Sequence, residues 1–119
     1  MALRVTSDAT SYPAGVQPTL TLSLVDVGSK PCVVDLGPTA TSITVLSAGK
    51  PAWTSSNCVD KPARPVNLTP SAAQELKLGW DRTTNTGGCS SVKALPPGQY
   101  ELLASVGHAV AYGGAFSLA

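Results

Sequence analysis

Charged side chains are scarce in this sequence. Lys, Arg, Asp and Glu make up 13% of the 119 residues, and the formal net charge is +1. Nucleic acids and anionic membranes attract proteins with a surplus of positive charge, so neither is expected as the main partner. The sequence also contains no apolar run close to the roughly 18 residues that a membrane helix requires. A membrane span is therefore not expected within these residues.

A secretion signal is also missing from the start of the sequence. The stretch from Met1 to Arg4 lacks the basic and apolar regions of a signal peptide, which by itself predicts a cytoplasmic protein. Three cysteines in a chain with so few charges indicate a disulfide and an oxidising compartment instead. We therefore favour an extracytoplasmic domain whose upstream signal or anchor helix is absent from this sequence.

The residues that are present predict one all-β domain over residues 1–119. Hydrophobic residues make up 43% of the chain, which is sufficient for one core in a domain of this length. Eleven Gly and ten Pro interrupt the sequence every eight to twelve residues, with short segments rich in Val, Leu, Ile and Thr between them. This spacing is typical of a β-sandwich, here with seven to nine antiparallel strands.

The clearest predicted strand covers residues 19–27. Leu20, Leu22 and Leu24 alternate with polar residues, which gives the strand one apolar face. Residues 74–80 suit a helix by propensity, but the alternation of Leu76, Leu78 and Trp80 and the presence of a glycine favour a strand. The other predicted strands cover residues 3–5, 32–36, 42–46, 52–54, 66–69, 100–106 and 111–118.

Three stretches carry a resemblance to known domains. They are "AGKPAWTSS", "VNLTPSAAQELKLGWD" and "PPGQYELLASVG". Together they resemble the BsuPI-like intracellular proteinase-inhibitor domains, which have an immunoglobulin-like sandwich fold. The stretches "YPAGVQPTLTLSLVDVGSKPCVVDLG", "WTSSNC" and "WDRT" are more similar to extracytoplasmic domains of actinobacterial membrane proteins. That resemblance covers about residues 11–116 and implies a cytoplasmic tail, one membrane helix and an immunoglobulin-like domain outside the membrane.

The aromatic residues are few but informative. Trp53 and Trp80 are the largest side chains, and core packing is the simpler interpretation of both. The alternative is a partly exposed surface on which a sugar or a peptide stacks. Tyr100 begins a late strand and is expected to cap an edge of the sandwich, as tyrosine does in many immunoglobulin-like folds.

The three cysteines allow one disulfide and leave one thiol. Cys58 and Cys89 lie in predicted loops that follow the two tryptophan-bearing segments, so we predict that these two residues are joined. Such a bond would stabilise the fold by about 3–4 kcal/mol in the chain-entropy model. The alternative pairing is Cys32 with Cys58. Otherwise Cys32, beside two valines, is expected to act as a small buried hydrophobic residue.

No catalytic or metal-binding constellation is apparent. Cys32, His108 and an aspartate are the residue types of a nucleophile, its base and an orienting group, but His108 lies in a predicted turn and no nucleophile-elbow motif is present. The cysteines do not form the short spacings of a zinc site. We therefore predict no catalytic residue, no metal and no cofactor.

The predicted binding surface consists of two long loops, residues 55–65 and 81–95. They carry half of the positive charge, and a disulfide between them would form one mildly basic surface at one end of the sandwich. The expected binding residues are Trp53, Lys61, Arg64, Arg82 and Lys93. The simpler interpretation is that these charges only maintain solubility.

These observations predict a non-catalytic binding or scaffolding domain of the bacterial cell envelope. The expected partner is an envelope protein or a cell-wall component, with membrane attachment only through a segment outside this sequence. The alternative follows from the BsuPI resemblance and is a protease inhibitor. In that case the proline-rich stretch from Lys61 to Pro65 would enter a protease cleft. The oligomeric state does not follow from the sequence.

Overall fold

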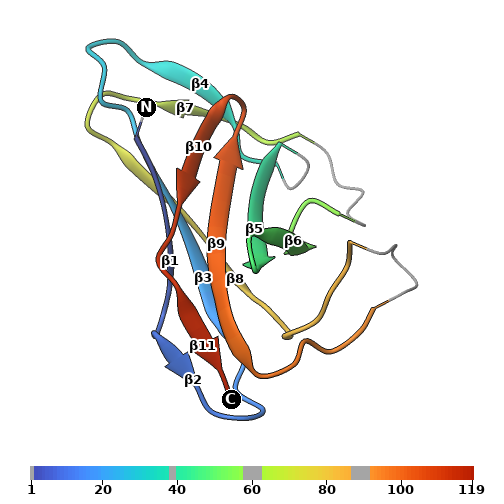
Figure 1. Ribbon diagram of the computed structural model, residues 1–119. Helices are drawn as coiled ribbons and strands as arrows, with labels where there is room; N and C mark the ends of the chain where they lie inside the picture. Colours follow the sequence, from blue (N-terminus) through green and yellow to red (C-terminus); the bar gives the residue numbers. More distant parts are fainter. Residues whose placement is uncertain (1, 38–39, 58–62, 87–91) are drawn as a thin grey trace.

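The protein is all-β, as predicted. The computed structural model describes residues 2–37, 40–57, 63–86 and 92–119, and within these ranges it contains eleven strands and no helix (Figure 1). The strands are β1 (Ala2–Ser7), β2 (Ser11–Tyr12), β3 (Thr19–Val25), β4 (Cys32–Asp35), β5 (Thr41–Ser47), β6 (Lys50–Thr54), β7 (Pro65–Leu68), β8 (Ala73–Gly79), β9 (Gly98–Val106), β10 (Ala109–Tyr112) and β11 (Phe116–Leu118).

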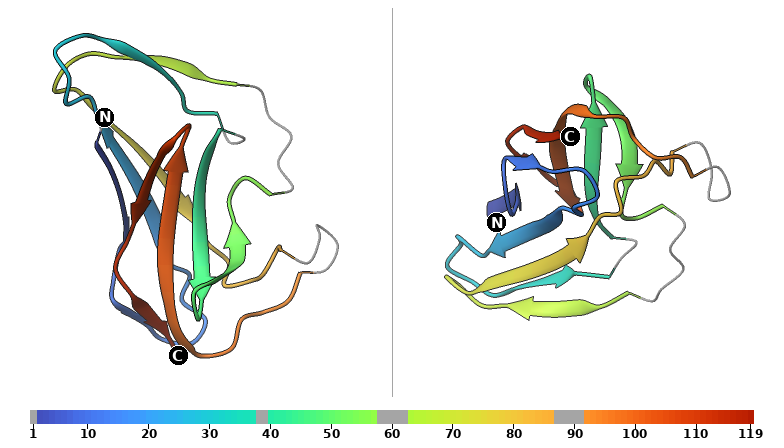
Figure 2. Two further views of the ribbon diagram at one scale, coloured as in Figure 1. Left: turned by 45° about the horizontal axis from the view of Figure 1, so that its top comes forward. Right: turned by 90° about the horizontal axis from the view of Figure 1, so that it is seen from below.

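The strands form two main sheets and one smaller pair. One sheet has the order β1-β3-β8, and the other has the order β2-β11-β9-β5-β6, with β10 also paired to β9. The two main sheets face each other as layers, which Figure 2 shows from two further directions. Strands β4 and β7 form a separate antiparallel pair. Leu36 and Leu68 extend the core to this pair, which therefore covers one end of it.

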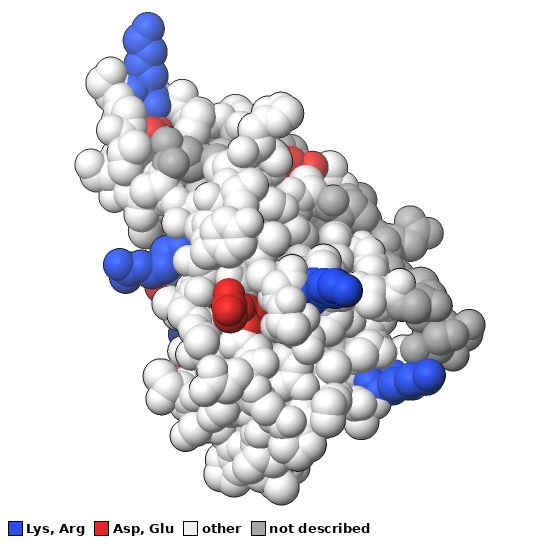
Figure 3. All heavy atoms as spheres, in the orientation of Figure 1, with Lys and Arg blue, Asp and Glu red and all other residues white. Residues whose placement is uncertain are grey.

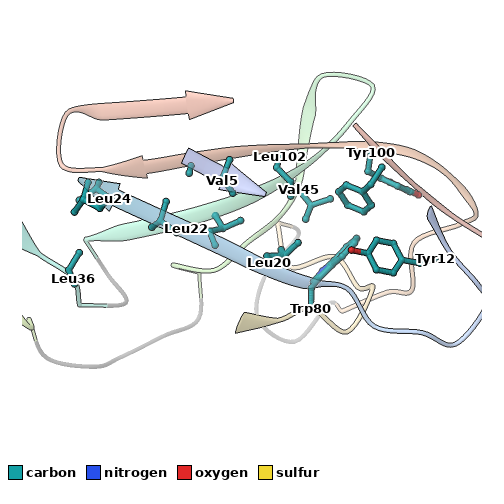
Figure 4. Packing of buried hydrophobic residues seen from close by; sticks show 14 of the residues in the cluster. Val5, Tyr12, Leu20, Leu22, Leu24, Leu36, Val45, Trp80, Tyr100 and Leu102 are labelled. Carbon is teal, nitrogen blue, oxygen red and sulfur yellow. The ribbon is translucent and has the colours of Figure 1, made fainter. Parts of the chain in front are cut away.

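The alternating pattern of β3 directs its leucines into the core. Leu20, Leu22 and Leu24 are each no more than 2% exposed, while the residues between them are partly exposed. Figure 4 shows these leucines along β3, with Val45 and Leu102 contributed by the facing sheet. Burial of one such side chain stabilises the fold by about 1.5–3 kcal/mol.

Trp80 lies at the centre of an aromatic cluster. Its side chain is fully buried, and its ring centroid lies 6.1 Å from that of Phe116, 6.3 Å from that of Tyr100 and 6.1 Å from that of Trp53. The indole Nε1–H donates a 3.0 Å hydrogen bond to the carbonyl oxygen of Thr83, so the polar atom of the ring is satisfied. Core packing is therefore confirmed for Trp80.

The ambiguous segment before Trp80 is a strand. β8 pairs antiparallel with β3 along its whole length, from Gly79 opposite Thr19 to Ala73 opposite Val25. Leu76 and Leu78 point toward the core and are half-buried. Residues 74–80 have similar propensities for helix and for strand, and pairing with β3 makes them a strand.

Two details of the predicted strand set are wrong. The described residues contain eleven strands rather than seven to nine, and β2 runs parallel to β11 rather than antiparallel. One reason is that β2 has only two residues, which is too short for an alternating pattern. The other is that the predicted last strand is divided at Gly113-Gly114 into β10 and β11, which pair with different parts of β9.

Candidate functional site

The two predicted binding loops meet at one edge of the sandwich. The side-chain amide of Asn85 donates a 2.7 Å hydrogen bond to the carbonyl oxygen of Thr54 and accepts one of 2.8 Å from the backbone N–H of the same residue. The backbone N–H of Asn85 also donates to the carbonyl oxygen of Ala52, at 3.1 Å. Asn57 reaches the carbonyl oxygen of Asn85 at 3.4 Å. One described flank of each loop, at Asn57 in the first and at Asn85 in the second, is therefore fixed to the exposed edge of β6.

Arg82 is held by the protein itself. Its guanidinium donates hydrogen bonds to the carbonyl oxygens of Pro13, Val16 and Ala119. Its backbone has a φ of 64°, in the left-handed region that is unfavourable for a residue with a Cβ. A role of Arg82 in binding stays a prediction, and in this structure its head group joins a turn and the C-terminal residue to the loop.

Trp53 is half-buried and packs against the core. It lies on β6 and directs its ring toward Trp80, with an angle of 47° between the two ring planes. Only part of the ring remains open to a ligand. Core packing and ligand stacking are the two interpretations that the sequence leaves open for Trp53. The half-buried ring packs against the core, which agrees with the first.

Among the described residues of the two loops, Arg64 and Lys93 are the exposed cations. The backbone N–H of Arg64 donates to Oδ1 of Asp35 at 2.9 Å, and its carbonyl oxygen accepts from the N–H of Leu36 at 2.9 Å. The backbone of Lys93 pairs with Thr84 across the second loop. The side chains of Arg64 and Lys93 project from anchored backbone. Lys61 and the predicted disulfide of Cys58 with Cys89 lie outside the described residues.

Charged groups are sparse and separated on the face shown in Figure 3. This face carries the strands that lie in front in Figure 1, and most of its surface belongs to uncharged residues. Two large apolar side chains on β10 are exposed, Val110 at 59% and Tyr112 at 74%. The sheet face therefore does not present a strong charge to a partner.

A cavity of about 530 Å³ opens between β4 and the turn that joins β9 to β10. In Figure 1 this turn lies near β4 at the top of the molecule. Val33, Val34, Val106 and Ala109 give the cavity an apolar wall, and the turn at Gly107-His108 forms part of its rim. The turn predicted around His108 is confirmed.

Asp26 is the buried polar residue of this cavity. It is 4% exposed, and its Oδ1 accepts a 2.9 Å hydrogen bond from the backbone N–H of Gly28. Its Oδ2 is buried and has no hydrogen-bond partner among the residues that the structure describes. An unpaired buried carboxylate oxygen is unfavourable, so this atom marks a place where a donor would be stabilised.

Cys32 also lines the cavity and is a free thiol. Cys58, its partner in the alternative disulfide, lies outside the described residues. Desolvation raises the pKa of the Cys32 thiol, and the neighbouring carboxylate of Asp26 raises it further. The thiol is thus protonated near neutral pH, where a catalytic cysteine would need a lowered pKa.

Asp35 contributes a second carboxylate to the cavity wall. The backbone N–H groups of Arg64 and Gly37 donate to its Oδ1 at 2.9 Å and 2.8 Å, and they lower the pKa of this carboxyl group. Asp35 is therefore negatively charged at neutral pH. Within the described ranges, no three His, Cys, Asp or Glu side chains are grouped closely enough to hold a metal ion.

Asp26 is not among the predicted site residues, although the sequence contains a signal for it. The inward positions of β3 follow every second residue through Leu20, Leu22 and Leu24, and the next inward position is Asp26. A carboxylate at the next position on an apolar face is a candidate for burial. The glycine two residues later, whose N–H is bonded to that carboxylate, is typical of a turn of this kind.

In the described part of the chain, no helical segment has the length and apolarity needed to span a bilayer. No protein-family model and no curated protein matches the sequence. Solved structures do match the fold.

Three of these structures illustrate the likeness. A β-glucosidase from Erythrobacter marinus aligns with 99% of this chain at a TM-score of 0.57 and 11% identity. The alkylpurine DNA glycosylase AlkC from Pseudomonas fluorescens aligns with 98% at 0.59 and 14% identity. A β-glucosidase from Listeria innocua aligns with 98% at 0.57 and 7% identity. This chain spans 15%, 30% and 16% of their respective lengths. At such low identities the likeness establishes a common fold and nothing about activity.

Proposed function

We propose that this chain is a non-catalytic, immunoglobulin-like binding domain of a bacterial cell envelope. Its partner is an envelope protein or a cell-wall component, which it contacts through the loops of residues 55–65 and 81–95. The observation that carries the proposal is that Asn85 brings one flank of each loop together at β6. A rigid sandwich that fixes two long loops at one edge is the usual arrangement for recognition by loops.

Two features support the immunoglobulin-like assignment. Tyr100 lies near the start of β9, and its hydroxyl donates a hydrogen bond to the carbonyl oxygen of Pro96, four residues upstream. This contact has the form of the tyrosine corner found in immunoglobulin-like sandwiches. The N-terminal part of the chain also serves both sheets, since β1 pairs with β3 in one and β2 pairs with β11 in the other.

The similar structures support a role as an accessory domain. Nearly the whole of this chain corresponds to between 15% and 30% of each longer protein. A domain of this fold therefore occurs as one part of larger chains. This is the relationship expected if the present domain belongs to a protein that is anchored elsewhere.

The chemistry of the thiol supports a non-catalytic role. Cys32 and His108 line the same cavity, together with Asp26. Nucleophilic catalysis would require a thiolate, but burial and the Asp26 charge raise the pKa of the Cys32 thiol. The envelope location rests on the cysteine content and on the resemblance to extracytoplasmic domains.

The protease-inhibitor alternative has weaker support. An inhibitory loop commonly presents free backbone groups for pairing with the protease as an added strand. At Arg64 both the backbone N–H and the carbonyl oxygen are already bonded, to Asp35 and Leu36. This residue would have to give up these bonds before it could enter a protease cleft in that way.

A sedimentation experiment tests the proposed function. The purified domain is mixed with insoluble cell walls and, separately, passed over immobilised envelope proteins of the source bacterium. We expect retention above background on one of the two materials. The double variant Arg64→Gln/Lys93→Gln should lower retention by about threefold or more, since two exposed cations are lost.

The matched control is the double variant Arg4→Gln/Lys30→Gln. It also removes one Arg and one Lys from exposed positions, but outside the two loops. Its retention should equal that of the wild-type domain. Absence of retention on both materials, or an equal loss in both double variants, would contradict a specific role of the loops.

A further inference from the structure

We propose that the cavity between β4 and the β9–β10 turn binds a primary ammonium group carried on a short aliphatic chain, with the carboxylate of Asp26 as its partner. This site is separate from the edge of β6 to which the two loops are attached. The loop surface meets the cavity wall where the backbone N–H of Arg64 donates to Asp35, but the proposed ligand contact is at Asp26, so either proposal can fail without the other.

The size and the wall of the cavity suit a small organic ligand. Its volume of about 530 Å³ lies within the range of roughly 300–1,000 Å³ that is usual for small-molecule sites. Val34 and Val106 belong to different strands and supply opposing apolar surface. An aliphatic chain that enters between them would lose its contact with water, which favours binding.

Asp26 supplies the polar contact. It is buried, and its Oδ1 is already bonded to the N–H of Gly28, while Oδ2 has no partner in the described part of the chain. The thiol of Cys32 interacts with the Asp26 carboxylate both through its charge and through a side-chain hydrogen bond, but a thiol is only a weak donor. An ammonium group would give Oδ2 a charge-assisted hydrogen bond, which is stronger than a neutral one.

The charge of the lining selects a cation. Its titratable groups are Asp26, Asp35, Cys32 and His108, and the described lining includes no Lys or Arg. Asp35 adds a second negative charge near the first. An anionic ligand would be repelled by both carboxylates and would find no basic side chain in this wall.

The lining also indicates which kind of cation is bound. No aromatic side chain is among the lining residues that the structure describes. Quaternary ammonium groups have no N–H and are recognised mainly by aromatic cages. A primary ammonium group has three N–H donors, and it matches an unpaired carboxylate oxygen. This chemistry is shared by free alkylamines and by lysine side chains of another protein.

The experiment is a titration followed by NMR amide spectra of the ¹⁵N-labelled domain. The probes are n-butylammonium, n-butanol and butyrate, which have similar chains but differ in charge. We expect n-butylammonium to shift the amides of Gly28, Val34 and Ala109 in a saturable way, with at least about tenfold weaker binding of n-butanol and of butyrate. Equal binding of n-butanol, or no saturable shift with n-butylammonium, would overturn the proposal.

Two variants separate the carboxylate from the cavity. Asp26→Asn keeps an oxygen for Gly28 but removes the charge, and it should weaken n-butylammonium binding by about tenfold or more. Ala109→Leu keeps the charge and fills part of the cavity, so it should also weaken binding. Dispersed amide spectra show that each variant is folded. If both folded variants bind n-butylammonium as the wild type does, the site is refuted.

A chemical probe on the wild-type domain gives a test without substitution. Cys32 lines the cavity, and its thiolate displaces methanesulfinate from a methanethiosulfonate to form a mixed disulfide. The rate constant of each reagent with Cys32 is divided by its rate constant with free cysteine, and peptide mass spectrometry locates the modified residue. We expect this ratio to be at least about tenfold higher for the aminoethyl reagent than for the sulfonatoethyl reagent. No preference for the cationic reagent would contradict the proposed selectivity.

The same titration distinguishes the two sources of the amine. An acetylated and amidated Gly-Lys-Gly peptide is compared with n-butylammonium and with the same peptide acetylated at the lysine Nζ. Tighter binding of the unmodified peptide than of n-butylammonium assigns the site to a protein side chain, and weaker binding assigns it to a free amine. Equal binding of the Nζ-acetylated peptide would overturn the requirement for an ammonium group.

Discussion

The backbone N–H of Gly113 donates a 2.7 Å hydrogen bond to the carbonyl oxygen of Leu102, at the point where β10 ends and before β11 begins. At this point the edge of one sheet meets β1 of the other. A Cβ added to Gly113 would lie 2.7 Å from the carbonyl oxygen of Val5 and 3.0 Å from the Cβ of Leu102. The two sheets can approach this closely because residue 113 has no side chain.

We predict that Gly113→Ala destabilises the fold. The added methyl group would overlap a backbone oxygen, which cannot move aside as the end of a side chain can, so β1 or the β10–β11 junction must shift. Overpacking of this kind lowers the free energy of unfolding by about 1–3 kcal/mol. Urea denaturation followed by tryptophan fluorescence measures the change.

The neighbouring glycine provides the control for this variant. A Cβ at Gly114 would meet nothing within 4 Å, so Gly114→Ala should change the free energy of unfolding by no more than about 0.5 kcal/mol. If the two alanine variants are equally stable, the close approach at Gly113 is not important for stability.

A second prediction concerns the hairpin between β5 and β6. The two turn residues of this hairpin, Ala48 and Gly49, have φ values of 51° and 78°. Such a turn favours Asn-Gly, because alanine is strained at positive φ and asparagine tolerates it. Ala48→Asn should therefore raise the free energy of unfolding by about 0.5–1 kcal/mol. Gly49→Ala introduces the strain that the first variant relieves and should lower stability. The midpoint of urea denaturation measures both changes. A midpoint for Ala48→Asn below that of the wild type would contradict backbone strain at Ala48.

A third prediction concerns the guanidinium of Arg82. Arg82→Gln removes donors from the carbonyl oxygens of Pro13, Val16 and Ala119, so the turn at residues 13–16 should exchange its amide hydrogens faster. The free energy of unfolding should fall by about 1 kcal/mol, since these bonds are charge-assisted but partly exposed. Lys50→Gln removes an exposed positive charge from β6 and serves as the control. Unchanged exchange in the turn would contradict a structural role of Arg82.

Parts of this fold could be predicted because the information is local. The leucines of β3 and the segment ending at Trp80 carry an alternating pattern, and the all-β class follows from such patterns and from the spacing of glycine and proline. The two-residue β2 could not be predicted, because it exists only through its parallel pairing with β11, more than a hundred residues away in sequence.

The candidate sites were less predictable because they are formed by residues that are distant in sequence. The cavity joins Asp26 and Cys32 with the turn at Gly107-His108, and no local pattern reveals that these segments are neighbours. Arg82 was predicted to bind a partner because it is a cation in a loop. Its contacts with Pro13 and Ala119 depend on how both ends of the chain are folded against that loop.

The last prediction concerns acid stability and Asp35. Hydrogen bonds from the backbone N–H groups of Arg64 and Gly37 lower the pKa of this carboxyl group in the folded protein below its usual value of 3.8. The unfolded chain therefore takes up the proton first as the pH falls. The stability contributed by ionised Asp35 is fully present above the unfolded pKa and is lost as the pH falls through the folded pKa.

Asp35→Asn should be less stable than the wild type at pH 6, because the neutral amide oxygen is a weaker acceptor for the same two N–H groups. The difference should shrink as the pH is lowered below 3.8, where the carboxyl group of the wild type also becomes neutral. Urea denaturation at a series of pH values between about 2 and 7 measures both free energies. Glu75→Gln removes a negative charge from an exposed position of β8 without removing these bonds. The difference in free energy of unfolding between Asp35→Asn and the wild type could instead be constant across the whole pH range. That result would show that the two hydrogen bonds do not stabilise the ionised form of Asp35.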